Sequence, residues 1–68
     1  MRKERDMMTK REKEILQGVI SGKTNQQIAN ELFISVHTVK AHLDSLFRKA
    51  GVLNRVQLAV FALENGFK

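Results

Sequence analysis

Residues 25–43 read NQQIANELFISVHTVKAHL, and this stretch decides the fold. Two apolar runs at helical spacing lie on either side of a break of only two residues, Phe33 and Ile34, between Leu32 and Ser35. Two helices joined by so short a break cross at a large angle, which is the geometry of a helix-turn-helix. Because Phe33 and Ile34 are too apolar for an exposed loop, we expect this turn to pack on the first and fourth helices of the chain.

Capping residues and glycines around this motif predict two further helices. Thr9, followed by Glu12, fits a capping box that begins a first helix, and Asn54 begins a fourth. Glycines after apolar runs supply the left-handed residue that ends a helix. No window alternates apolar and polar residues, so we predict an all-α fold, a compact four-helix helix-turn-helix domain. The expected helices run from Thr9 to Gly22, for about two turns after Thr24, from Ser35 to Gly51, and over 55–64 or 55–65.

Two of these helix starts also predict hydrophobic staples, in which the residue before the N-cap packs on the fourth residue of the helix. The expected pairs are Ile34 with Val39 and Leu53 with Leu58. Gly18 lies inside the first apolar run and weakens that helix slightly.

The composition limits the class of protein. With 68 residues there is room for one domain, and we expect residues 1–7 to be a flexible lead-in or linker end and 8–68 to be the domain. The net charge of +5 favours a polyanionic partner, although solubility alone could explain it. The chain has no Cys, no apolar run near the roughly 20 residues that span a bilayer, and no secretory signal, so we expect a cytoplasmic protein without membrane contact.

The third predicted helix has an apolar side and a polar side. Opposite the stripe of Val39 and Leu43, the spacing brings small, basic and hydrogen-bonding side chains together. Small Ala41 lets a helix approach base edges, and Lys40 can donate to guanine O6 and N7. Asp44 favours the alternative of a merely solvated side, because a carboxylate near phosphates is unfavourable unless it accepts from cytosine N4. The predicted base contacts are His37, Lys40, Ala41 and Asp44.

Polar residues at two helix starts predict contacts to the DNA backbone. Hydroxyl and backbone N–H groups at a helix start bind phosphate. His42 lies on the flank of the apolar stripe, so it could donate to a phosphate or pack at the edge of the core. The predicted backbone contacts are Lys23, Thr24, Asn25, Ser35, Thr38, His42, Arg48 and Lys49.

The fourth predicted helix has almost no polar side. A helix that is apolar all round requires burial on more than one side, and a bundle this small covers only one. The simplest cover is the same helix of a second copy, with the lead-in or a further domain as alternatives. The predicted homodimer interface is Val56, Leu58, Ala59, Phe61, Ala62 and Leu63.

Enzymatic and metal chemistry are not expected. His37 and His42 are five residues apart and point to different sides of a helix, and no Cys supports a metal site. Ser35, His42 and Asp44 are too close on one helix to form a catalytic triad. We therefore predict no catalytic residue, no metal, no cofactor and no small-molecule ligand in this domain.

Several short motifs, in order, resemble the LuxR-type helix-turn-helix domain of bacterial regulators. They are Thr9-x-Arg11-Glu12, Gly22-Lys23-x-Asn25-x-x-Ile28-Ala29, Leu32-x-Ile34-Ser35, Thr38-Val39-Lys40-x-His42, and Lys49-x-Gly51-Val52-x-Asn54-Arg55. The resemblance covers residues 8 to 67 and implies a third helix in the major groove and a fourth helix as dimer contact. It points to Lys40 and Ala41 for base contacts and to Thr24, Asn25, Thr38 and His42 near the backbone. Base reading at Asp44 departs from the family pattern, in which a basic or polar residue is frequent.

We therefore predict a sequence-specific, non-enzymatic transcriptional regulator of double-stranded DNA, or the effector domain of a two-component response regulator, acting as a homodimer. RNA polymerase is a further partner that this role admits. One alternative is a protein-interaction module that uses the apolar fourth helix. Another is non-specific or RNA binding, which is disfavoured because the only aromatic residues are four Phe, of which Phe33 and Phe47 are expected in the core.

Overall fold

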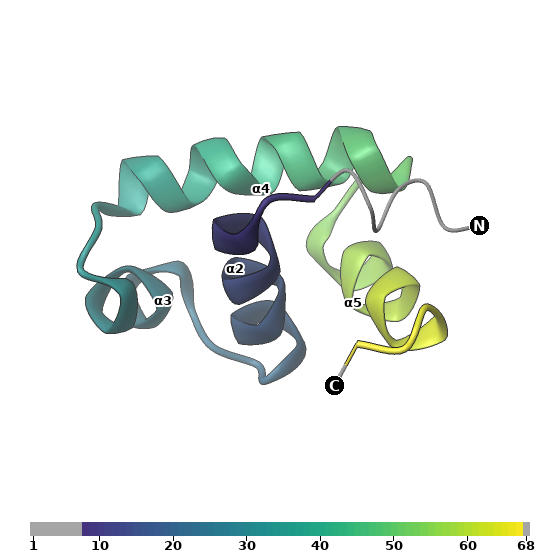
Figure 1. Cartoon of the computed structure of the whole chain (residues 1–68), viewed down its shortest axis with the longest axis horizontal. Coiled ribbons are helices and arrows are strands. Elements are labelled where there is room, and N and C mark those ends of the chain that lie inside the picture. The colour runs from purple at the N-terminus through teal and green to yellow at the C-terminus, as the bar shows by residue number, and fades with distance from the viewer. Residues whose placement is uncertain (1–7, 68) are drawn as a thin grey trace.

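The computed structural model describes residues 8–67, and the expectation for residues 1–7 lies outside that range. The described residues form the four predicted helices (Figure 1). These are α2 (Lys10–Ile20), α3 (Asn25–Leu32), α4 (Val36–Ala50) and α5 (Arg55–Glu64). The all-α prediction is confirmed, and no helix in this part of the chain is long and apolar enough to cross a membrane.

Side-chain caps begin the helices as the sequence predicts. The Thr9 hydroxyl accepts from the Glu12 N–H at 3.1 Å, and the Glu12 carboxylate accepts from the Thr9 N–H at 3.0 Å. Thr24 and Gln27 form the same reciprocal pair at the start of α3. The hydroxyl of Ser35 and the amide oxygen of Asn54 cap α4 and α5. Each cap satisfies backbone donors that a helix start otherwise leaves unpaired.

The longest helix, α4, lies along one edge of the molecule, and α2, α3 and α5 all lie on the same side of it (Figure 1). This arrangement gives α4 one covered side and one side without a neighbouring helix. The apolar stripes of the four helices meet on the covered side. The buried core consists of Met8, Ile15, Leu16, Val19, Ile28, Ala29, Val39, Leu43, Leu46, Leu58, Ala62 and Phe67.

The turn between α3 and α4 differs from the prediction at one residue. Ile34 is half-buried against the core, but Phe33 is 93% exposed and is not a core residue. Phe33 ends α3 in the left-handed conformation, with φ 59° and ψ 41°. That conformation reverses the chain within two residues and turns the Phe33 side chain away from the protein. Backbone geometry therefore overrides the apolar character of this side chain. Phe47, the other Phe expected inside, is half-buried against the core.

A second difference concerns the start of α5. Leu58 is fully buried, but Leu53 is 87% exposed, so the expected staple between these two residues is wrong. The backbone N–H of Leu53 instead donates to the Gln57 side chain at 2.8 Å. A hydrogen bond thus takes the place of the predicted apolar contact in fixing the entry to α5.

Gly18 allows α2 and α3 to pack closely. A Cβ atom at this position would lie 2.7 Å from Cγ1 and 2.8 Å from Cδ1 of Ile28. Any residue with a Cβ would force Ile28 to shift, so glycine permits this close contact in return for its small helix penalty. The sequence alone shows the helix penalty of Gly18 but not the contact with Ile28.

A buried carboxylate joins α2 to α4. Glu12 is 4% exposed, and it accepts from the Lys49 ammonium at 2.7 Å and the Ser45 hydroxyl at 2.6 Å. Burial alone would raise the pKa of Glu12, but the hydrogen bonds from Lys49, Ser45 and the Thr9 N–H outweigh it and lower the pKa from 4.5 to about 2. Glu12 therefore serves both as a cap for α2 and as an anchor for the C-terminal half of α4.

Candidate nucleic-acid interface

The side of α4 without a neighbouring helix carries the predicted base-contacting residues. His37, Lys40, Ala41 and Asp44 are all exposed, as is Arg48 one turn further on. Val39, Leu43 and Leu46 on the covered side are buried. In the part of the chain that the structure describes, no other helix lies over the polar side (Figure 1). Within residues 8–67, this side of α4 is thus uncovered at the residues predicted to contact bases.

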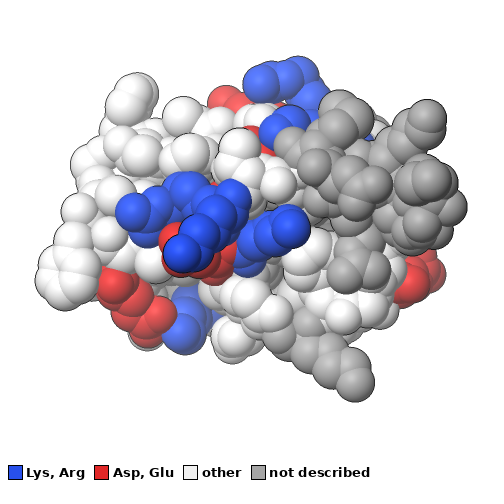
Figure 2. All heavy atoms as spheres, viewed as in Figure 1, with Lys and Arg blue, Asp and Glu red and all other residues white. Residues whose placement is uncertain are grey.

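Charge alone does not identify this surface. Figure 2 shows basic side chains gathered over α2 with acidic ones among them, and further basic side chains on the α4 side of the molecule. On α2, Arg11 pairs with Glu14 at 3.2 Å. Such pairs reduce the local excess of positive charge, so exposure and residue type distinguish the polar side of α4 better than net charge does.

Two hydroxyl groups lie together at the start of α4. The Ser35 oxygen accepts from the Thr38 N–H at 3.0 Å and lies 2.9 Å from the Thr38 hydroxyl oxygen. One of the two hydroxyl hydrogens fills that contact, which leaves the other free to donate outward. Together with the backbone N–H groups of the first turn, this hydroxyl gives the helix start the donors that an anion requires.

The start of α3 is held from two directions. Its own capping box fixes Thr24, whose hydroxyl accepts from the Gln27 N–H at 3.1 Å. Arg55, the first residue of α5, donates from Nη1 to Asn25 Oδ1 at 2.7 Å and from Nη2 to the Lys23 carbonyl oxygen. The role of Arg55 cannot be seen in the sequence, because the contact spans 30 residues along the chain. The signal for Arg55 in the sequence is its place in the motif Lys49-x-Gly51-Val52-x-Asn54-Arg55.

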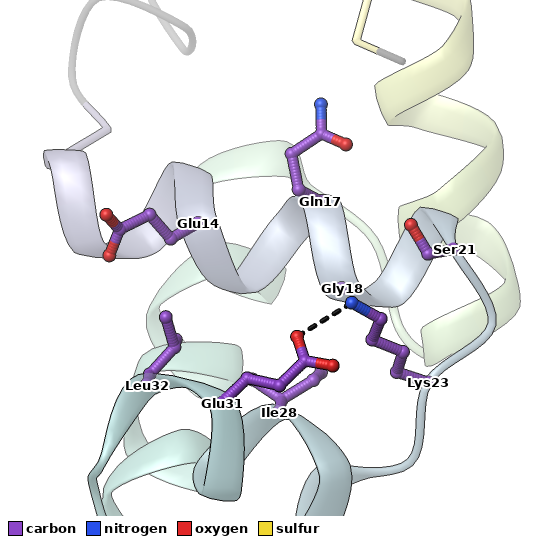
Figure 3. Close-up of a pocket in the computed structure, with 8 residues that line it drawn as sticks. All are labelled: Glu14, Gln17, Gly18, Ser21, Lys23, Ile28, Glu31 and Leu32. Carbon is purple, nitrogen blue, oxygen red and sulfur yellow. Dashed lines mark hydrogen bonds and ion pairs between the residues drawn. The ribbon is translucent and has the colours of Figure 1, made fainter.

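Two predicted backbone contacts are lysines with acidic partners. Lys23 pairs with Glu31 at 2.7 Å across a hollow of about 260 Å³ between α2 and α3 (Figure 3). An exposed pair of this kind contributes about 1 kcal/mol or less, so Lys23 can exchange Glu31 for a phosphate. Lys49 is different, because its ammonium is committed to the buried Glu12. A contact between Lys49 and the DNA backbone stays a prediction, and it would have to form with the pair to Glu12 in place.

The start of α3 and the polar side of α4 meet at a shared hollow of about 320 Å³. It joins one predicted backbone contact, Asn25, to two predicted base contacts, Lys40 and Asp44. His42 is half-buried on α4, and its contact with a phosphate stays a prediction. The residues that line the hollow are Asn25, Lys40, Leu43, Asp44, Phe47 and Arg55.

On α5 the structure corrects the predicted dimer interface. Leu58 and Ala62 are fully buried in the core of the single chain and have no surface to offer a second copy. Val56 is 72% exposed, Leu63 is 55% exposed, and Val60, which the prediction omitted, is 48% exposed. The excess apolar surface of α5 is therefore real, but only its outer side carries it. Ala59 and Phe61 are half-buried and pack against the core.

Comparison with known proteins agrees with this geometry. The family model described as "Bacterial regulatory proteins, luxR family" matches residues 6–62. The transcriptional regulatory protein LiaR of Bacillus subtilis is 47% identical over 60 residues, which are 88% of this chain and 28% of LiaR. The spore germination protein GerE of Bacillus subtilis is 42% identical over 88% of this chain and 81% of its own length.

A solved structure shares the fold as well as the sequence. VqmA bound to DPO superimposes with a TM-score of 0.86 at 40% identity, over 88% of this chain and 30% of that one. The chain therefore spans under a third of LiaR and of VqmA, and most of GerE. The family match, the relatives and the open polar side of α4 lead to one conclusion: this chain belongs to the LuxR family of bacterial regulatory proteins, as a non-enzymatic DNA-binding domain of a transcriptional regulator.

Proposed function

We propose that the domain reads a specific sequence of double-stranded DNA by inserting the polar side of α4 into the major groove. The observation that carries this proposal is that His37, Lys40, Ala41 and Asp44 are exposed together on the one side of α4 without a neighbouring helix. Lys40 donates to guanine, Ala41 permits close approach and contacts a thymine methyl, and Asp44 accepts from cytosine. His37, in the first turn, lies where this motif enters the groove.

Backbone phosphates fix the register of the domain on the duplex. We assign this role to the starts of α3 and α4, where Thr24, Asn25, Ser35 and Thr38 lie at or near the surface. Arg48, which is exposed, and His42 and Lys23 extend the contact with positive or donor groups. Such contacts supply affinity without sequence preference, whereas base contacts supply the preference.

The proposal includes a homodimer formed through α5. Its support is the exposed apolar side of Val56, Val60 and Leu63, with a shallow hollow of about 450 Å³ beside Val56, Val60 and Phe61. A similar solved structure, 40% identical with a TM-score of 0.86, is described as a VqmA dimer. A two-fold dimer would read two half-sites about one helical turn apart. A cytoplasmic location and contact with RNA polymerase belong to the same proposal.

Selection of bound sequences from random duplexes, with stoichiometry measured on the selected duplex, tests this function. We expect a two-fold symmetric consensus that binds two chains per duplex. Lys40→Ala should remove most of the preference for that consensus over random DNA, while Lys10→Ala, on the exposed surface of α2, should not. Affinity should fall steeply with salt. If substitutions on the polar side of α4 leave function intact while those on α5 abolish it, the domain is a protein-interaction module instead.

A further inference from the structure

Arg55 links the helix of the proposed dimer contact to the start of α3. It is the first residue of α5, it is half-buried, and its guanidinium reaches Asn25 Oδ1 at 2.7 Å and the Lys23 carbonyl oxygen. These two acceptors stand on either side of Thr24, the N-cap of α3. One rigid, planar group thus holds the chain both before and after a residue that we assign to phosphate contact.

The chemistry of this contact fixes the orientation of the Asn25 amide. A guanidinium has only donors, so it can be satisfied by the oxygen of the amide and not by its nitrogen. The Oδ1 atom therefore faces Arg55, and the two N–H donors of Nδ2 face away from it. Within residues 8–67, those donors have no hydrogen bond to another residue.

Phosphate oxygens only accept hydrogen bonds, so a contact from Asn25 to the DNA backbone requires the donor end of its amide. We propose that Arg55 is a positioning residue for DNA binding, which holds the Asn25 amide with its N–H donors presented to a backbone phosphate. This inference rests on the proposed function. The inference adds Arg55 of α5 to the residues that support DNA binding. Arg55 acts through Asn25, which lines a hollow together with Lys40.

Affinity for a random-sequence duplex of about 25 base pairs tests the inference, because that length holds two half-sites and phosphate contacts do not depend on sequence. Arg55→Lys keeps the charge but loses the planar fork, and Asn25→Ala removes the donor. Each should weaken binding about tenfold, the scale of one hydrogen bond to a charged group. Because both act through one contact, the double variant should be no weaker than either single variant. Arg11→Lys, at the surface pair with Glu14, is the matched control and should bind like the wild type.

A second variant separates positioning from a merely structural role. Asn25→Asp keeps an acceptor for Arg55, so its melting temperature should equal or exceed that of the wild type, yet it offers phosphate no donor. It should bind at least tenfold more weakly than Gln26→Glu, which makes the same charge change at the neighbouring exposed position. All affinities are compared at a temperature where circular dichroism shows each variant to be folded.

Three outcomes overturn the inference while wild-type binding stands. They are Arg55→Lys binding within twofold of the wild type, single effects that multiply in the double variant, and Asn25→Asp binding as well as Gln26→Glu. A wild-type domain that binds neither random nor selected duplexes would instead refute the proposed function itself.

Discussion

The buried carboxylate of Glu12 should make the domain sensitive to acid. Its pKa is 4.5 in an ordinary setting and about 2 in the folded protein. At about 1.4 kcal/mol for each tenfold change in the acid dissociation constant, this difference corresponds to about 3 kcal/mol of stability. The folded pKa is lowered, so the contribution is complete above about pH 5 and is lost as the pH falls toward 2. A core of this size supplies only about 3–5 kcal/mol in all, so the loss should unfold much of the population.

Urea unfolding followed by circular dichroism at a series of pH values measures this effect. The free energy of unfolding of the wild type should fall by about 3 kcal/mol between pH 5 and pH 2 beyond the fall seen in Glu12→Gln, which cannot titrate. Glu14→Gln, which alters the surface pair with Arg11, is the control and should follow the wild type.

Glu12→Gln leaves Lys49 without its carboxylate partner and could fail to fold. Direct titration of the Glu12 carboxyl carbon by NMR in the wild type therefore provides a second measurement. An apparent pKa of Glu12 near 4.5 would refute the stabilising role of its buried contacts with α4. So would a free energy of unfolding that depends on pH in the same way in the wild type and in Glu12→Gln.

Three further substitutions test other parts of the structure. Gly18→Ala should destabilise the domain by about 1–3 kcal/mol in urea unfolding, because its Cβ would lie 2.7 Å from Ile28 Cγ1. Gln17→Ala, on the exposed side of α2, is the control and should change the free energy of unfolding little. Equal effects of the two substitutions would contradict the close contact. Phe33→Gly should raise the free energy of unfolding by about 0.5–1 kcal/mol, because the left-handed backbone at φ 59° strains any residue with a Cβ and the Phe33 side chain is 93% exposed. A lower free energy of unfolding would show that Phe33 has a stabilising contact. Val60→Glu should prevent paired binding to the two half-sites while leaving unfolding unchanged, and an unaltered stoichiometry in sedimentation would exclude α5 as the dimer contact.

Local chemistry made most of the fold predictable. Capping residues at Thr9, Thr24, Ser35 and Asn54 and the glycines that end helices act within a few residues, so the sequence shows them directly. The polar side of α4 was predictable for the same reason, because helical periodicity places every third or fourth residue on one side.

Contacts between distant residues were not predictable. The partners of Glu12 on α4 lie 33 and 37 residues away, and Arg55 lies 30 residues from Asn25. For the same reason, the sequence could not show which apolar residues of α5 are buried, such as Leu58, and which are exposed, such as Val60. That depends on where α2 and α4 lie. The predicted burial of Phe33 was wrong for a different reason, because its left-handed backbone, and not its hydrophobicity, determines its exposure.

The long-range contacts that stabilise the position of α4 lie away from the surface that would contact DNA. Glu12 holds α4 through Ser45 and Lys49, and Leu46 between them is fully buried. On the polar side, His37, Lys40 and Ala41 are exposed and form none of these links. Substitutions there should therefore change which base pairs are preferred at almost no cost in folding, typically within about 0.5 kcal/mol for such surface positions. A scaffold built in this way can acquire a new DNA sequence preference without first acquiring new stability, because the residues that would read the bases are not the residues that hold α4 in place.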